Sequence, residues 1–314
     1  MQRILDPAQI EAFAERAIPR VRLSDPANLF TRRAQRLRAL AEQHSLGDYL
    51  RLMAAVADGQ QIALDALVGA MEAEPFAQPL SRQIELAHEH RMPLLSAAGW
   101  PRPQRWRGIL NELCTSIAGA PGFPAGVRSA CERIVDRSDA EIETQADFLL
   151  GARMAGVEPA YAPFLMAALQ VYWAGMVTTL EVADAREIDA LGVCPVCGTL
   201  PVASIVRSDK RSQGYRYLHC GLCATEWHMV RITCSHCLAN DGIVYHSIEG
   251  GSEAVRAESC GQCHTYRKIL YQEKDPDVEP VADDLASLAL DLLMTQEGFH
   301  RGSGNPLLWQ SAET

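Results

Sequence analysis

The feature that most constrains the fold of this chain is a set of four Cys-x-x-Cys pairs within one stretch of 70 residues. The pairs are Cys194/Cys197, Cys220/Cys223, Cys234/Cys237 and Cys260/Cys263. They are separated by 22, 10 and 22 residues, so the last two pairs repeat the first two at a distance of 40 residues. This spacing predicts two consecutive copies of a small metal-binding ribbon, each holding one ion with four thiolates.

The pairs could share their ions in two ways. Sequential pairing joins the first pair with the second and the third with the fourth, so that each ribbon is closed on itself. A cross-braced arrangement would instead join the first pair with the third. We favour sequential pairing because duplication of a closed unit explains the 40-residue repeat without further assumptions.

Four sulfur ligands leave no open coordination position for water, which argues against hydrolytic metal catalysis. Zinc and iron both accept tetrahedral sulfur, and the spacing does not separate them. Zinc would be structural, whereas iron would form a rubredoxin-like site that can cycle one electron. His219 and His264 adjoin ligand cysteines and could replace a thiolate, but with eight cysteines available we expect solvent-facing histidines.

Composition and charge exclude several classes of protein. The chain has 314 residues, enough for about two domains, and its 48% hydrophobic and 22% charged residues are typical of a globular protein. A net charge of −10 argues against a nucleic-acid partner. The N-terminus carries no secretory apolar run, so we expect a cytoplasmic protein whose thiols stay reduced. The uncharged stretch 160–180 lacks basic anchors, so we expect a buried core helix and no membrane span.

The hydrophobic pattern predicts an α + small β fold with four parts. Residues 1–188 are expected to form an all-helical domain, residues 189–230 and 231–274 two rubredoxin-like ribbons, and residues 275–314 a linker, a C-terminal helix and a tail. The expected helices are 48–74 with an interruption near Gly59, 80–91, 104–118, 124–137, 139–155, 161–187 and 283–294. The expected ribbon strands are 202–206, 215–218, 243–246 and 254–256.

No motif indicates a catalytic centre. The sequence contains no Walker loop, no dinucleotide fingerprint after a strand and no nucleophile elbow. A thioredoxin-type redox pair would need a helix start in a βαβ context, which the pattern lacks. The sequence therefore gives no positive sign of a catalytic centre, although a one-electron role for bound iron stays open.

The cysteine region resembles the formate dehydrogenase accessory (formation) protein family. The resemblance rests on Cys194-Pro-Val-Cys-Gly198, Tyr217-Leu-His-Cys-Gly-Leu-Cys223, Glu226-Trp-His228 with Arg231, Cys234-Ser-His-Cys237 and Cys260-Gly-Gln-Cys263. It continues through the helix at Asp283 and the tail from Gly298 to Pro306. The specific match covers about 120 residues. The helical portion contains no sharp motif of the family.

This resemblance implies a cytoplasmic accessory protein that is not an enzyme: a chaperone that binds the catalytic subunit of respiratory formate dehydrogenase before twin-arginine export. It also implies self-association and rubredoxin-like iron bound by the eight cysteines. The flanking residues that it suggests for contact with the client are Tyr217, Glu226, Trp227 and Arg231. A rubredoxin-like electron carrier or reductase acting on a metalloenzyme is the alternative function.

Overall fold

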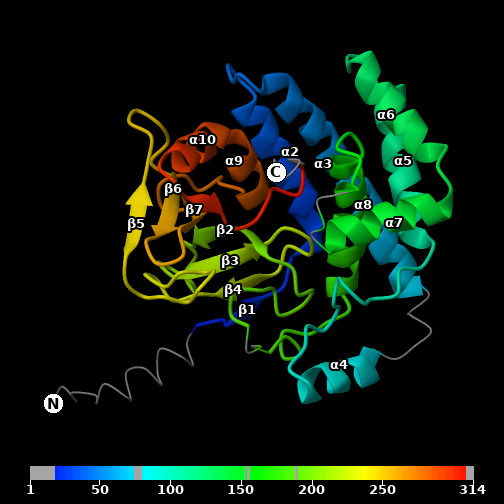
Figure 1. Ribbon diagram of the computed structural model, residues 1–314. Coiled ribbons are helices and arrows are strands. Elements are labelled where there is room, and N and C mark those ends of the chain that lie inside the picture. The colour runs from blue at the N-terminus through cyan, green and yellow to red at the C-terminus, as the bar shows by residue number, and fades with distance from the viewer. Residues whose placement is uncertain are drawn as a thin grey trace.

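The structure is a computed structural model that describes residues 18–73, 80–151, 153, 156–186, 188 and 190–308. A helical part and a β part lie side by side, with the C-terminal helices against the β part (Figure 1). The helical part contains η1 (Pro26–Asn28), α2 (Leu29–Leu40), α3 (Gly47–Ala73), α4 (Leu80–Glu89), α5 (Arg105–Gly119), α6 (Ala125–Val135), α7 (Asp139–Leu150) and α8 (Ala162–Val177). The expected α + small β fold is confirmed, but two helices are shorter than expected: α7 ends at Leu150, and α8 ends at Val177 and is followed by turns through residue 184. Glu74, Ala155, Glu187 and the tail beyond Leu308 lie outside the described residues.

Helix α8 is the core of the helical part. All of its residues except Met166 are buried, and it packs against α3 and α5. The indole N–H of Trp173 donates to the carbonyl of Leu95 over 2.9 Å. Among the described residues, no helix is long and apolar enough to cross a membrane. The uncharged stretch thus forms a helix that other helices surround, as its lack of basic anchors suggests.

Helix α3 corrects one expectation, because it runs through Gly59 without an interruption. A Cβ atom at residue 59 would lie only 2.7 Å from Cδ2 of Leu113 on α5. The glycine therefore allows two helices to approach closely, which a sequence pattern cannot distinguish from a break.

Within the described residues, the strands form one mixed sheet with the order β1-β4-β3-β2-β7-β6-β5, and β8 pairs with β7. The strands are β1 (Val21–Arg22), β2 (Pro201–Val206), β3 (Arg216–Cys220), β4 (Glu226–His228), β5 (Ile243–His246), β6 (Val255–Cys260), β7 (Thr265–Tyr271) and β8 (His300–Arg301). Strand β1 was not expected in a helical region. It forms because Val21 and Arg22 pair with Trp227 and Glu226 at the edge of the sheet, a tertiary contact that two residues cannot encode.

The two ribbons are joined into this single sheet. Antiparallel β2-β3-β4 forms the first ribbon and antiparallel β5-β6-β7 the second, and parallel pairing of β2 with β7 connects them. A buried ion pair also crosses between them, because Nη2 of Arg216 lies 2.6 Å from Oε1 of Glu258. The two copies of the sequence repeat therefore form one continuous sheet.

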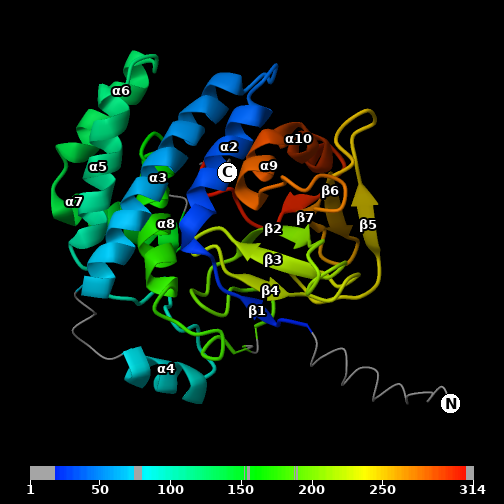
Figure 2. The same ribbon diagram turned by 180° about the vertical axis from the view of Figure 1, so that it is seen from behind.

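The C-terminal segment forms two short helices, α9 (Pro280–Ala286) and α10 (Leu288–Gln296), where one was expected. The break lies at Ser287, whose hydroxyl donates to the carbonyl of Asp283 over 2.6 Å and so competes with the helical hydrogen bonds. Helix α9 contacts both α2 and β2 and thus lies between the helical part and the sheet (Figure 2). The expectation that this segment packs back on the body is met.

Candidate metal centres

The eight paired cysteines gather into two clusters of four sulfur atoms. Site 1 contains Cys194, Cys197, Cys220 and Cys223, and site 2 contains Cys234, Cys237, Cys260 and Cys263. Within each site all four sulfurs lie within 4.8 Å of one another. The clusters correspond to sequential pairing, and cross-bracing does not occur. Each site draws one pair from the turn before its ribbon's first strand and the other from the end of its second strand.

The distances fit one tetrahedral ion at each site. In site 1, Sγ of Cys197 lies 3.3 Å from Sγ of Cys220, and the distance from Cys194 to Cys223 is 3.5 Å. In site 2 the two corresponding distances are both 3.7 Å. A tetrahedron with metal–sulfur bonds of about 2.3 Å has sulfur–sulfur edges of about 3.8 Å. All ten cysteines are free thiols, so disulfides do not explain the clusters.

A common backbone conformation builds the four turns. The residue that follows the second cysteine of each pair has positive φ: Gly198 (76°), Ala224 (57°), Leu238 (63°) and His264 (54°). Amide N–H groups of these turns point at the sulfurs, as when Leu222 and Cys223 each donate to Sγ of Cys220 over 3.3 Å. Such hydrogen bonds stabilise thiolate charge. Glycine generally suits a left-handed position because it has no Cβ. Of the four turns, however, only the first has glycine there.

Threonine hydroxyls near the sulfurs were not anticipated from the sequence. The hydroxyl oxygen of Thr199 lies 3.1 Å from Sγ of Cys197 and 3.2 Å from Sγ of Cys220. Thr225 similarly lies 3.3 Å from Sγ of Cys223. Thr199, Thr225 and Thr265 each stand two residues after the second cysteine of a pair. The pattern Cys-x-x-Cys-x-Thr in the sequence thus indicates a threonine hydroxyl close to the sulfurs, where it can adjust the properties of a metal–sulfur site.

Site 1 is enclosed by the helical part of the molecule. Its four cysteines are buried. The amides of Leu95 and Ala97 donate to the carbonyls of Val196 and Cys197 over 2.7 and 2.8 Å, and Gln170 of α8 donates to the carbonyl of Gly221 over 2.6 Å. Burial raises the pKa of the Cys194 thiol well above its ordinary value. A bound cation would therefore stabilise the thiolate form of Cys194.

Site 2 is closer to the surface. Cys234 and Cys260 are buried, but Cys237 is exposed and Cys263 is half-buried. Burial would raise the pKa of the Cys263 thiol, but hydrogen bonds with Thr265 and with the neighbouring cysteines outweigh burial and lower it to about 7. The second site therefore has the more accessible sulfurs.

His219, one of the two histidines expected to face solvent, lies in the interior instead. His219 is buried beside Cys220, and its Nδ1 lies 3.1 Å from Oε1 of Glu226. The ring points away from the sulfur cluster into a pocket, because residues next to each other on a strand face opposite sides of the sheet. Burial alone would raise the pKa of Glu226, but Arg207 and His219 outweigh it and hold the pKa at about 2.

Most residues suggested for contact with a client lie in the interior. Tyr217, Glu226 and Trp227 are buried. The Tyr217 hydroxyl donates to the carbonyl of Pro19 over 2.9 Å, and the Trp227 indole donates to that of Leu191 over 2.9 Å. These side chains hold neighbouring segments of the chain and offer little surface to another protein. Arg231 is exposed, and a role in partner contact stays a prediction for it.

Fold and sites together define a helical protein with a tandem pair of four-cysteine ribbons fused into one sheet. Family models match the chain in three consecutive parts: "FdhE, N-terminal" over residues 18–190, "FdhE, central domain" over 193–231 and "FdhE, C-terminal domain" over 232–308. The chain belongs to the FdhE family, the formate dehydrogenase accessory proteins that its cysteine region resembles.

Relatives match over nearly the whole length. The "Protein FdhE homolog" of Cronobacter sakazakii is 44% identical over 311 residues, which cover 98% of this chain and 97% of that protein. "Protein FdhE" of Salmonella paratyphi A is 44% identical over 283 residues, which cover 90% and 88%. The crystal structure of the FdhE protein from Pseudomonas aeruginosa matches with a TM-score of 0.81 and 38% identity, covering 92% of this chain and 99% of that one.

Proposed function

We propose that this chain is a cytoplasmic, non-enzymatic accessory protein that binds the catalytic subunit of respiratory formate dehydrogenase during maturation, before twin-arginine export. The proposal rests above all on membership in the FdhE family over residues 18–308. We further propose that each four-cysteine site holds one metal ion, with iron favoured by the family and zinc as the other candidate.

The chemistry of the two sites supports an accessory role. Four cysteine sulfurs fill a tetrahedral coordination sphere, so an ion in either site has no position for a substrate or a nucleophilic water. The sites instead fix the turns of the ribbons, and they join the helical part to the sheet at residues 195–197 and 221. Metal binding would therefore shape a surface for another protein.

We propose that the client contacts the segment between the two ribbons. Arg231 is exposed there, and its neighbours Val230 and Ile232 are 60% and 59% exposed. Exposed apolar side chains beside an arginine fit a protein interface, whose core is more apolar than ordinary surface and in which arginine is enriched. The segment also connects β4 of site 1 to the first turn of site 2, so the state of both sites would affect its position.

Co-purification tests this function. Tagged chain, purified anaerobically, should capture the formate dehydrogenase catalytic subunit, and a strain lacking the chain should lose formate dehydrogenase activity. The double variant Val230→Ser/Ile232→Ser should lose capture, whereas Leu292→Ser, which changes an exposed leucine on α10, should retain it. Absence of capture together with normal activity in the deletion strain would refute the accessory function.

The exposure of Cys237 favours a second candidate, a rubredoxin-like electron carrier acting on a metalloenzyme. Electron exchange with another protein is easier when a ligand of the site reaches the surface. Anaerobic purification followed by visible spectroscopy and redox titration distinguishes the two candidates. A coloured protein with a reversible one-electron transition would favour the carrier, and a colourless zinc protein would exclude it.

A further inference from the structure

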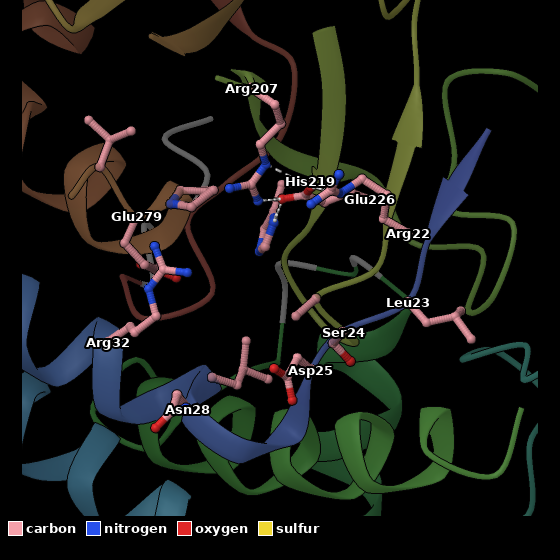
Figure 3. A pocket seen from close by; sticks show the side chains of 14 residues that line it. Arg22, Leu23, Ser24, Asp25, Asn28, Arg32, Arg207, His219, Glu226 and Glu279 are labelled. Atoms are coloured by element: carbon pink, nitrogen blue, oxygen red, sulfur yellow. Dashed lines mark hydrogen bonds and ion pairs between the residues drawn. The ribbon is translucent and has the colours of Figure 1, made fainter. Parts of the chain in front are cut away.

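A pocket lies between the helical part and the sheet, with His219 and Glu226 of the sheet on one side and Asn28 and Arg32 of the helical part on the other (Figure 3). Its walls come from three stretches that are distant in sequence, residues 22–32, 207–226 and 278–280. It encloses about 200 Å³. That volume accommodates a few water molecules or one small polyatomic ion, since a water molecule occupies about 30 Å³ of liquid.

His219 offers the pocket a buried nitrogen without a partner. Its Nδ1 faces the carboxylate of Glu226 at 3.1 Å, and because a carboxylate only accepts hydrogen bonds, Nδ1 carries the proton. In the neutral imidazole Nε2 is then an acceptor. Nε2 is buried and has no hydrogen-bond partner among the described residues. In Figure 3 the ring extends into the pocket, so a ligand that donates an O–H would satisfy this nitrogen.

Two arginines bring unused donors to the same space. Glu226 accepts from Nε and Nη2 of Arg207, which leaves Nη1 without a hydrogen bond in the described part of the chain. Arg32 is exposed and makes neither a hydrogen bond nor an ion pair with any described residue. Figure 3 shows Arg32 rising from α2 on the side of Glu279.

Of the three acidic side chains in the walls, Glu226 and Glu279 pair with arginines, whereas Asp25 is exposed and has only a backbone hydrogen bond. Glu226 pairs with Arg207 and with Arg22. Glu279 lies 3.0 Å from Nε of Arg33, and Asp25 accepts from the amide of Ala27. The groups left for a ligand include two guanidinium donors, the imidazole acceptor and the hydroxyl of Ser24, which is buried without a hydrogen-bond partner among the described residues. They call for negative oxygens and one O–H on the same small molecule.

We propose that this pocket binds hydrogen phosphate, with anionic oxygens on Arg32 and Arg207 and the O–H donated to Nε2 of His219. Arginine matches the geometry of phosphate oxygens well. Hydrogen phosphate carries both acceptors and a donor, whereas sulfate at neutral pH carries acceptors only. The pocket should therefore prefer phosphate to sulfate.

Isothermal titration calorimetry of the metal-loaded full-length chain tests the proposal. We expect saturable binding of one inorganic phosphate per chain and binding of sulfate that is weaker by about tenfold or more. Arg32→Gln should weaken phosphate binding by about tenfold or more without altering the far-UV circular dichroism or the metal content.

The matched control is Arg38→Gln, which changes an exposed arginine of the same helix that pairs with Asp58 away from the pocket. It should leave phosphate affinity within about twofold of the wild type. The proposal is overturned by a lack of saturable phosphate binding up to about 10 mM, or by unchanged affinity in Arg32→Gln. Equal affinity for sulfate would remove the role assigned to His219.

Discussion

At the scale of single residues, the four cysteine turns depend on one left-handed backbone position each. Three of these positions are held by residues with a side chain, Ala224, Leu238 and His264. A left-handed conformation costs such a residue roughly 1–2 kcal/mol relative to its preferred one. Because the cost recurs at three independent turns, the turn geometry that collects the sulfurs must outweigh it each time.

The first turn allows a direct test of this geometry. Gly198→Ala should destabilise the protein by roughly 1–2 kcal/mol, because φ is 76° there and a Cβ would lie 3.0 Å from Cγ of Pro93. Gly221→Ala, in the second turn of the same site, meets only ordinary contacts near 3.5 Å and should cost much less. Chemical unfolding at constant metal saturation compares the two, and equal effects would show that the left-handed position does not matter.

At the scale of elements, two glycines of helix α3 differ in the space around them. Gly69 is exposed and a Cβ atom at this residue would meet no other atom within 4 Å, so Gly69→Ala should stabilise the protein by about 1 kcal/mol through helix propensity. Gly59→Ala should gain less or destabilise, since Leu113 would have to move. Thermal unfolding measures both, and a gain of the same size at both residues would contradict the close packing of α3 on α5.

The C-terminal helices are attached to strand β7 by buried charges. Nζ of Lys268 lies 2.6 Å from Oδ2 of Asp291 and 3.5 Å from Oδ1 of Asp284, and Arg301 pairs with both aspartates. Asn305 donates to Asp284 over 2.7 Å. Removing one member of such a buried network leaves uncompensated charge. We expect Asp284→Ala to cost about 3–5 kcal/mol of unfolding free energy.

The pH dependence of this network has a defined sign. Burial alone would raise the pKa of Asp284, but Arg301 and Lys268 outweigh burial and hold it below its ordinary value. A depressed carboxyl pKa adds stability above the unfolded pKa of about 3.9, and this stability is lost as the pH falls through the folded pKa. The difference in unfolding free energy between wild type and Asp284→Asn should be constant above about pH 5 and shrink below about pH 4. A difference that grows on acidification would contradict the assignment.

The contrast between sequence and structure is clearest at this scale. Repeated cysteine spacing predicted both ribbons and favoured their sequential pairing, because duplication of a closed unit accounts for the 40-residue repeat. It could not predict β1, which depends on Trp227 and Glu226 more than 200 residues away, nor the break at Ser287. The sequence also did not predict that Tyr217, Glu226 and Trp227 are buried, because a motif shows which residues occur together but not the direction in which their side chains point.

At the scale of the whole molecule, the two sites differ in their surroundings although their sequences repeat. Site 1 lies against the helical part, whereas site 2 lies in the ribbon that ends in the sheet edge β5 (Figure 1). Arg267 of β7 connects the two: its Nε donates to Ser235 in site 2 over 2.8 Å, and its Nη1 donates to the carbonyl of Pro201, just after the first turn of site 1. One residue thus connects the first turn of site 2 with the start of β2, the strand that follows the first turn of site 1.

The difference in exposure predicts an order of reaction. When a chelator competes for the metal, iodoacetamide should alkylate Cys237 and Cys263 before any cysteine of site 1. Peptide mapping by mass spectrometry at successive times gives the order. Alkylation of Cys194 or Cys220 at the rate of Cys237 would show that the helical part does not protect site 1.

The central claim is that eight cysteines form two closed metal sites. Native mass spectrometry of the anaerobically purified chain tests it most directly. We predict a mass that corresponds to two bound metal ions per chain, falling to one ion in Cys194→Ser/Cys197→Ser and to one in Cys234→Ser/Cys237→Ser. A metal-free chain whose mass instead shows disulfides between these cysteines would contradict the account.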